Sequence, residues 1–369
     1  MKIHPEQLVP GCLLTKDVMG NAIHPLIPAD TVVEPIHLRV LQRFRIQTVT
    51  IAPRLVNGEL FKAQEKETSE MEDRSQAQDE NRSAWTFYDY YADAVKQTKV
   101  ITDRLIETNQ LELEPVRKLL HPLLTHPDDR KRILLKLHHY TDKHQYIYHH
   151  MVAMAVIASS LAMKMGYGEG DQLKVGLAAY LSDMGMFRDG VSFYLKEAKL
   201  TDEEFEQVKK HPVTSYRLIE HVPHLSKDIK LAVLQHHERL DGSGYPLGLK
   251  QEKIHPFANI IAVSDTFHAM TSERLYRRKQ SPYKVVEELL QRLAGILDMK
   301  AIDALIQDYL SLEIGMKVRL SNRDQGTIVF INDANPARPF VKQEEEDKII
   351  DLNEHRDLYI EEVLDNEES

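Results

Sequence analysis

The stretch HHERLDGSGYP, from His236 to Pro246, combines two adjacent histidines with a glycine-rich turn. The histidines end an apolar helical run, Ile229 to Leu234. Adjacent helical side chains point about 100° apart, so both histidines reach one site only where the helix frays or where two metal ions lie side by side. Gly242 and Gly244 would let the backbone approach a phosphate closely. The simpler alternative is a helix end capped by histidine and glycine.

Four further histidine and aspartate residues lie at the ends of apolar runs or of amphipathic helices. Asp183 follows AAYL and Asp265 follows IIAV, so both carboxylates stand where the pattern predicts burial. His150 opens the run MVAMAVIASSLAM, and His211 precedes Pro212 after a charged amphipathic helix. Each residue alone would be explained as a helix end or a hydrogen-bonded core position, because buried polar groups are normally satisfied locally.

Together these residues are nitrogen and oxygen donors on successive predicted helices: His150, Asp183, His211, His236, His237 and Asp265. Such a set suits one or two divalent cations, such as iron, manganese, zinc or magnesium, with Asp183 as a bridge. The single cysteine, Cys12, excludes both a cysteine zinc site and an internal disulfide.

The elements that would position these donors form a mainly α fold with an all-helical domain at residues 84–312, where apolar residues recur at spacings of three and four. Residues 1–60 contain short β-like runs and prolines, which predict a small α/β or mainly β domain. A polar acidic linker, 61–83, has almost no aliphatic side chains to bury. After Gly315, period-two alternation predicts a small β-rich C-terminal region, 313–369, with an acidic tail.

Composition excludes several classes of protein. A length of 369 residues with 42% hydrophobic content suffices for two or three domains, and the net charge of −10 argues against broad nucleic-acid binding. The N-terminus MKIHPEQLVPGCLL lacks the apolar core of a signal peptide. The longest uncharged apolar run, Met151–Met163, is shorter than the roughly 20 residues that cross a bilayer. We therefore expect a cytoplasmic protein without a membrane span.

Between Tyr146 and Leu297, five ordered blocks resemble the HD-GYP family. In chain order they are YIYHHM, AAYLSDMGMF, LTDEEFEQVKKHP, HHERLDGSGYPLGL and IIAVSDTFHAMTSERLYRR. That family is a helical, metal-dependent group of phosphodiesterases within the HD superfamily, and it hydrolyses the bacterial second messenger cyclic di-GMP. The resemblance implies the HD fold, a divalent metal cofactor, and cyclic di-GMP or a related nucleotide as ligand.

Carried over position by position, the family's metal ligands fall on the six donors named above, with Asp183 as the retained catalytic residue of the HD pair. Its substrate contacts fall on Gly244, Tyr245, Arg274 and Arg277. In such a site two metals polarise the phosphodiester and deprotonate a bound water, and guanidinium groups hold phosphate oxygens. For the two arginines, a solvated helix end is the alternative.

Three positions depart from the family's pattern. Ser182 stands where the family has the histidine of its His-Asp pair, and Met186 stands where it has the lysine of GK. Serine is a poor ligand for these ions and methionine carries no charge. Tyr146 stands where some members have an additional glutamate, which argues against a trinuclear site. We expect one metal to be kept, with hydrolysis weak or absent. The retained ligand set would be Asp183, His211, His236 and His237.

Three classes of function stay open from the sequence. The chain is a working cyclic di-GMP phosphodiesterase, a non-hydrolysing cyclic di-GMP sensor, or a protein-interaction module whose GYP loop docks a partner such as a diguanylate cyclase domain. Preservation of ERLDGSGYP beside the replaced residues 182 and 186 favours the second and third. The sequence leaves the oligomeric state open, with a homodimer as one option, and it does not identify the signal sensed by residues 1–60.

Overall fold

The computed structural model describes most of the chain from residue 85 onward. The described ranges are 85–126, 144–188, 196, 198–273, 279–309, 312–332, 335–344 and 348–364, with separate residues between 2 and 54. Two compact units divide the chain, Met1–Trp85 and Thr86–Ser369. The predicted linker, 61–83, lies outside the described residues.

The first unit has a small β structure with its own apolar core. Strand β1 (Lys2–Ile3) pairs antiparallel with β2 (Val49–Thr50), and isolated bridges join Leu13 to Val32 and Leu14 to Ile51. Cys12 is buried in this core. The described part of this unit therefore consists of short strands and bridges around a small apolar core.

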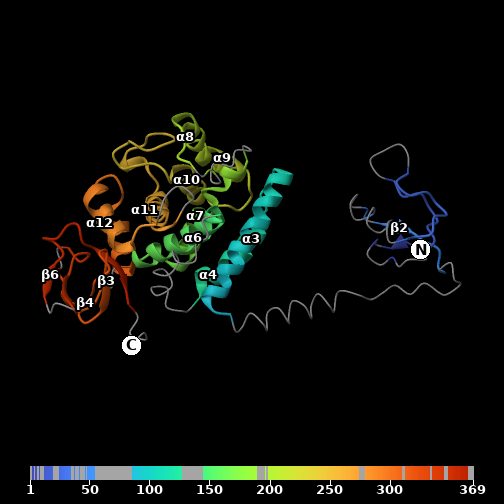
Figure 1. Cartoon of the computed structure of the whole chain (residues 1–369). Coiled ribbons are helices and arrows are strands. Elements are labelled where there is room, and N and C mark those ends of the chain that lie inside the picture. Colours follow the sequence, from blue (N-terminus) through green and yellow to red (C-terminus); the bar gives the residue numbers. More distant parts are fainter. Residues whose placement is uncertain are drawn as a thin grey trace. The chain divides into compact units, whose positions relative to one another are not determined.

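Helices make up most of the second unit (Figure 1). Those in the described ranges are α3 (Phe87–Thr108), α4 (Leu113–Thr125), α6 (Tyr146–Lys164), α7 (Glu169–Leu181), the 3-10 turn η3 (Met184–Phe187), α8 (Asp202–Val208), α9 (His211–Ile219), α10 (Lys227–Gln235), η5 (Gln251–Lys253), α11 (Pro256–Thr271), α12 (Pro282–Arg292) and α13 (Met299–Tyr309). Capping boxes start two of them, since Thr86 and Thr201 each accept from the backbone three residues on. Proline in the first turn starts α9, α11 and α12.

Helix α6 lies at the centre of the helical layer and packs against α7 and α11. Among the described helices, it alone is long and apolar enough to cross a membrane, but 89% of its apolar window is buried inside the protein. Such a helix, apolar on all sides, is typical of a domain core. Helix α6 is therefore the core helix of this domain, and the neighbouring helices pack around it.

An antiparallel sheet follows the helices. Its strands are β3 (Lys317–Leu320), β4 (Gln325–Phe330), β5 (Phe340–Gln343), β6 (Ile349–Asp351) and β7 (Ile360–Val363), in the order β6-β5-β4-β3-β7. Burial alternates along β3 and β4, as a sheet with one covered face requires. The period-two pattern after Gly315 is thus confirmed as a small β-rich region.

The sheet packs against α12 and shares the apolar core of the helices (Figure 1). Arg338 is 5% exposed, and its guanidinium forms two hydrogen bonds with Glu287 of α12 at 2.7 and 2.9 Å. The Ser281 hydroxyl before α12 donates to the Ile360 carbonyl of β7 at 2.6 Å. The fold is therefore mainly α, with strands joined to the helical core through α12.

Candidate metal centre

Six imidazole and carboxylate side chains come together from different elements of the second unit. His150 lies on α6, Asp183 between α7 and η3, His211 at the start of α9, His236 and His237 directly after α10, and Asp265 on α11. We call these six side chains the His-Asp cluster. It coincides with the donor set predicted from the sequence, although the roles of its members as ligands stay a prediction.

Two carboxylates connect the imidazoles of the cluster. His150 Nε2 lies 3.3 Å from Asp183 Oδ2 and 3.2 Å from Asp265 Oδ1. The second oxygen of Asp183 lies 3.3 Å from His211 Nε2. The second oxygen of Asp265 lies 3.5 Å from His237 Nδ1. Each carboxylate therefore has one oxygen on His150 and one on the histidines opposite, an arrangement suited to a bridging ligand.

Three histidines form the tightest part of the cluster: His211, His236 and His237 offer ring nitrogens that all lie within 4.8 Å of one another. The Nδ1 atoms of His211 and His236 each lie 2.7 Å from a backbone carbonyl, of Val208 and Val233, so both Nδ1 atoms must carry the hydrogen. Their Nε2 atoms then present lone pairs to each other at 3.1 Å. That contact is repulsive unless a cation lies between or beside them, so the donors fit a metal ion.

The protonation states of these groups suit ligation. Burial, then the charges of neighbouring histidines, lower the pKa of His236 and His237 well below the usual 6.5. Burial would raise the pKa of Asp265, but the hydrogen bond and charge of His150 and the charges of His236 and Arg239 bring that pKa below its ordinary value. Neutral imidazoles and an ionised carboxylate are the forms that bind a metal.

Adjacent histidines can both reach the cluster because α10 ends at Gln235. The rings of His236 and His237 lie 4.1 Å apart, at an interplanar angle of 41°. His236 is the C-cap of α10 and His237 follows it in a turn, so both lie at the end of the helix. This confirms the expectation that the pair stands at a helix end.

A close approach of η3 and α9 sets Asp183 opposite His211. The Ser215 hydroxyl of α9 donates to the Ser182 carbonyl at 2.6 Å and accepts from the Gly185 amide at 2.8 Å. A Cβ added at Gly185 would lie 2.5 Å from the His211 carbonyl oxygen. Only glycine allows this distance, so the MGM turn is selected by packing.

The two replaced positions of the HD motif supply no donor to the cluster. Ser182 is fully buried, and its hydroxyl donates to the Ala178 carbonyl within α7 at 2.9 Å. That hydrogen bond is the usual local partner of a helical serine. Met186 is half-buried in η3 and has no ionisable group.

The GYP loop packs directly on the cluster. The ring of Tyr245 stacks on His237 with centroids 4.7 Å apart. Burial and the charge of Asp265 raise the pKa of the Tyr245 hydroxyl, which therefore stays protonated at neutral pH. At Gly244, an added Cβ would lie 2.4 Å from the Arg239 amide nitrogen, so only glycine fits. Arg274 and Arg277, the other predicted substrate contacts, lie outside the described residues.

Sequence reasoning missed three residues that support the cluster. Glu238 is 2% exposed, and its two carboxylate oxygens accept from the Leu247 and Leu249 amides at 2.7 and 2.8 Å, which fixes the GYP loop. Buried His268 shares a hydrogen bond of 2.9 Å with Nδ1 of His150. Arg239 acts on the cluster through its charge. Glu238 and Arg239 lie inside the stretch HHERLDGSGYP. For His268, the sequence signal was a histidine within the apolar run of α11.

The sequence of this chain is similar to a known family of domains and to several curated proteins. A family model described as HD domain matches residues 130–300. A cyclic di-GMP phosphodiesterase of Pseudomonas aeruginosa is 31% identical over 223 residues, which cover 60% of this chain and 52% of that protein. The cyclic di-GMP phosphodiesterase response regulator RpfG of Xanthomonas campestris is 35% identical over 161 residues, 43% of each chain. The chain thus spans about half the length of the curated relatives it matches.

The fold has a counterpart among solved structures. A HDG"Y"P protein from Bdellovibrio bacteriovorus superposes with a TM-score of 0.52 at 14% identity, covering 83% of this chain and 98% of that one. At this identity the likeness concerns the fold alone.

Proposed function

The chain carries an HD domain similar to those of HD-GYP cyclic di-GMP phosphodiesterases, and we propose that it binds a divalent metal in the His-Asp cluster and acts in cyclic di-GMP signalling with weak or absent hydrolysis. The observation that carries the proposal is the facing pair of Nε2 lone pairs on His211 and His236. Ser182 and Met186, the two replaced positions of the HD motif, contribute no metal ligand and no charge to the cluster.

The residues that would hold the metal are Asp183, His211, His236 and His237. Three imidazoles and one carboxylate suit iron, manganese or zinc. A divalent ion bound there would polarise a phosphodiester and lower the pKa of a bound water. His150 and Asp265 lie within hydrogen-bond distance of each other beside this set, and they would keep Asp183 in its bridging orientation.

The GYP loop and its surroundings would bind the nucleotide. The Tyr245 hydroxyl, kept protonated by burial, can donate to a phosphate oxygen. Gly244 lets the loop pack directly on the backbone of residues 237–239, which holds Tyr245 beside the cluster. Arg274 and Arg277 are proposed to hold further phosphate oxygens. Loss of the HD histidine and of the GK lysine removes one ligand and one cation. In other enzymes, removal of one hydrogen-bond donor that stabilises the transition state lowers kcat about 10²- to 10³-fold. The two losses in this chain therefore support weak turnover.

The direct test measures metal content and cyclic di-GMP turnover on the same anaerobically purified preparation. We expect about one transition metal ion per chain, with no linear dinucleotide or GMP formed at a rate expected of an intact HD-GYP site. A metal-free protein would reject the metal part of the proposal, and rapid turnover would reject the part on hydrolysis.

A paired restoration separates an eroded enzyme from a different kind of protein. The double variant Ser182→His with Met186→Lys returns the ligand and the cation to their positions. Gained hydrolysis of cyclic di-GMP, absent in the parent, would identify an eroded enzyme. Absence of turnover in both proteins would point to a distortion elsewhere in the site or to a different ligand.

A second candidate function is a protein-interaction module, favoured by the rigid GYP loop. Glu238 fixes the loop from inside, while Leu247 at its tip is 57% exposed. The loop therefore presents this apolar side chain to a partner in a fixed conformation. A diguanylate cyclase domain is the partner to try first. Binding that is lost in Leu247→Asp, with cyclic di-GMP titrations silent, would favour this candidate over a nucleotide sensor.

A further inference from the structure

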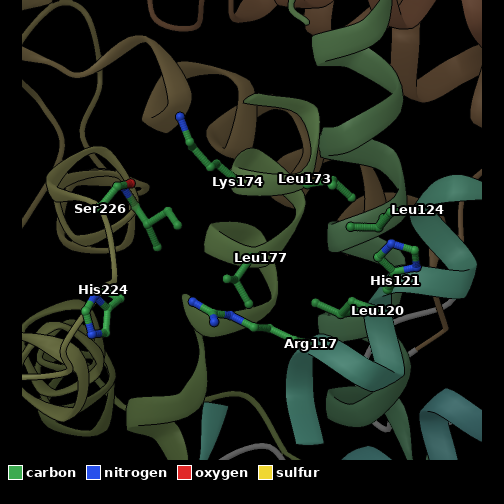
Figure 2. A pocket seen from close by; sticks show the side chains of 10 residues that line it. Arg117, Leu120, His121, Leu124, Leu173, Lys174, Leu177, His224 and Ser226 are labelled. Atoms are coloured by element: carbon green, nitrogen blue, oxygen red, sulfur yellow. The ribbon is translucent and has the colours of Figure 1, made fainter. Parts of the chain in front are cut away.

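A pocket that is partly open to solvent lies between α4, α7 and the beginning of α10, and none of the cluster residues lines it (Figure 2). Its volume is about 350 Å³, and small-molecule pockets usually measure roughly 300–1,000 Å³. Aliphatic side chains form most of its surface: Leu120, Leu124, Leu173, Leu177 and Ile229. All of these except the half-buried Leu173 are buried in the folded chain. The pocket is therefore an apolar hollow within the helical layer.

The polar lining has one sign of charge. Arg117, His121, Lys174 and His224 line the space, and no aspartate or glutamate is among its lining residues. Arg117 therefore places a positive charge at the edge of an apolar surface.

Arg117 is the cation best placed to meet a ligand. Lys174 already forms an ion pair with Asp171 at 2.8 Å. Within the described part of the chain, by contrast, no carboxylate pairs with Arg117. In Figure 2 its guanidinium extends from α4 towards His224, while the ammonium of Lys174 points elsewhere. A planar guanidinium favours a carboxylate, which it can bind through two parallel hydrogen bonds.

We propose that this pocket binds an amphipathic monoanion, a free medium-chain carboxylic acid whose aliphatic chain lies among the leucines and whose carboxylate meets Arg117. Aliphatic walls favour an unbranched hydrocarbon over the sugars and two phosphates of a cyclic dinucleotide. Positive charge at the rim disfavours an amphipathic cation.

The ligand would contact two helices that lead to the His-Asp cluster. Helix α7 ends at Leu181, two residues before Asp183, and α10 ends at Gln235, next to His236. Leu173 and Leu177 lie one turn apart on α7, and Ser226 is the N-cap of α10. The pocket is thus a separate site on the elements that position two of the proposed ligands.

Calorimetric titration of the whole chain with decanoate, below its micelle concentration, tests the proposal. We expect saturable binding of one decanoate per chain. Arg117→Gln removes the cation and should weaken binding about tenfold, because a charge-assisted hydrogen bond is lost. Lys118→Gln is the matched control, since this neighbour on α4 pairs with Glu114 and does not line the pocket. Its affinity for decanoate should equal that of the parent.

Two further measurements define the ligand class. Leu173→Trp should fill the pocket and abolish binding, with an unfolding temperature close to that of the parent as evidence that the variant folds. Decyltrimethylammonium should not bind. Lack of saturable decanoate binding, equal losses in both α4 variants, equal binding of the cation, or binding only to phosphatidylglycerol vesicles would each overturn the proposal. Should Leu173→Trp fail to fold, the difference in decanoate affinity between Arg117→Gln and Lys118→Gln still tests the proposal.

Discussion

Buried histidines of the cluster make the stability of the metal-free protein depend on pH. Burial and neighbouring charges lower the pKa of His236 and His237 well below 6.5 in the folded chain. Below pH 6.5 the unfolded chain takes up protons that the folded chain does not, so stability falls as pH falls. Above pH 6.5 this contribution is fully present. The loss should be on the order of 1 kcal/mol per pH unit below that value.

Urea unfolding of the metal-free protein at pH 7.5 and pH 5.5 measures this loss. His236→Gln should reduce the difference between the two pH values. His221→Gln, at a side chain that is 91% exposed, should leave the difference unchanged. A free energy of unfolding that stays level or rises towards pH 5.5 would contradict the prediction.

Glu238 should prove more important for the GYP loop than its place in a charged motif suggests. Its two oxygens accept from the Leu247 and Leu249 amides. Glu238→Gln replaces one acceptor by an NH₂ group that faces a backbone N–H, and leaving that donor unsatisfied costs about 1–3 kcal/mol. The measurement is the free energy of unfolding in urea, with the exposed Glu252→Gln as control. Equal stabilities of the two variants would show that the loop does not depend on this carboxylate.

At the scale of single residues, the sequence predicted the six side chains of the His-Asp cluster but not the groups that orient their imidazole rings. Polar residues in apolar helices stood out by pattern, and all six lie in one cluster. The groups that fix the imidazoles are backbone carbonyls of Val208 and Val233, which have no sequence signature. His268 contacts His150 across 118 positions of the chain, and such a distance in sequence hides the pairing.

Among the secondary structure elements, the packing of η3 against α9 controls the distance between Asp183 and His211. Gly185→Ala would place a Cβ 2.5 Å from the His211 carbonyl oxygen and 2.7 Å from the Ser215 amide nitrogen. Because both neighbours are backbone atoms, the two elements must separate. Overpacking of this kind costs typically about 1–3 kcal/mol. We also expect at least tenfold weaker metal binding, measured by competition with a chelator.

A matched glycine on α7 controls for the glycine-to-alanine change itself. Gly170 lies in the first turn of that helix, and a Cβ added there meets nothing within 4 Å. Gly170→Ala should therefore leave metal affinity unchanged and raise stability by up to about 1 kcal/mol. Similar metal affinities for the two alanine variants would refute the role of the contact between η3 and α9.

The fold class could be predicted because helical and alternating patterns change clearly near Gly315, and the strands begin at Lys317. What the pattern could not predict is that the sheet shares the helical core. That junction depends on Arg338 and Glu287, which lie 51 positions apart and read as ordinary surface charges in the sequence. The predicted divisions of the chain at residues 60, 83 and 312 stay predictions.

For the second unit as a whole, the buried pair Arg338–Glu287 should decide whether helices and sheet unfold together. The guanidinium is 6% and the carboxylate 14% exposed, so Glu287→Gln leaves a buried cation without its counter-charge. Breaking a buried pair on one side costs about 3–5 kcal/mol, and carbonyls of Leu352 and Arg356 that also accept from Arg338 favour the lower end. Urea unfolding should move to lower concentration for Glu287→Gln, and Glu288→Gln, its neighbour on α12, should match the parent. An unchanged midpoint in Glu287→Gln would mean that this ion pair is not needed to hold the sheet on α12.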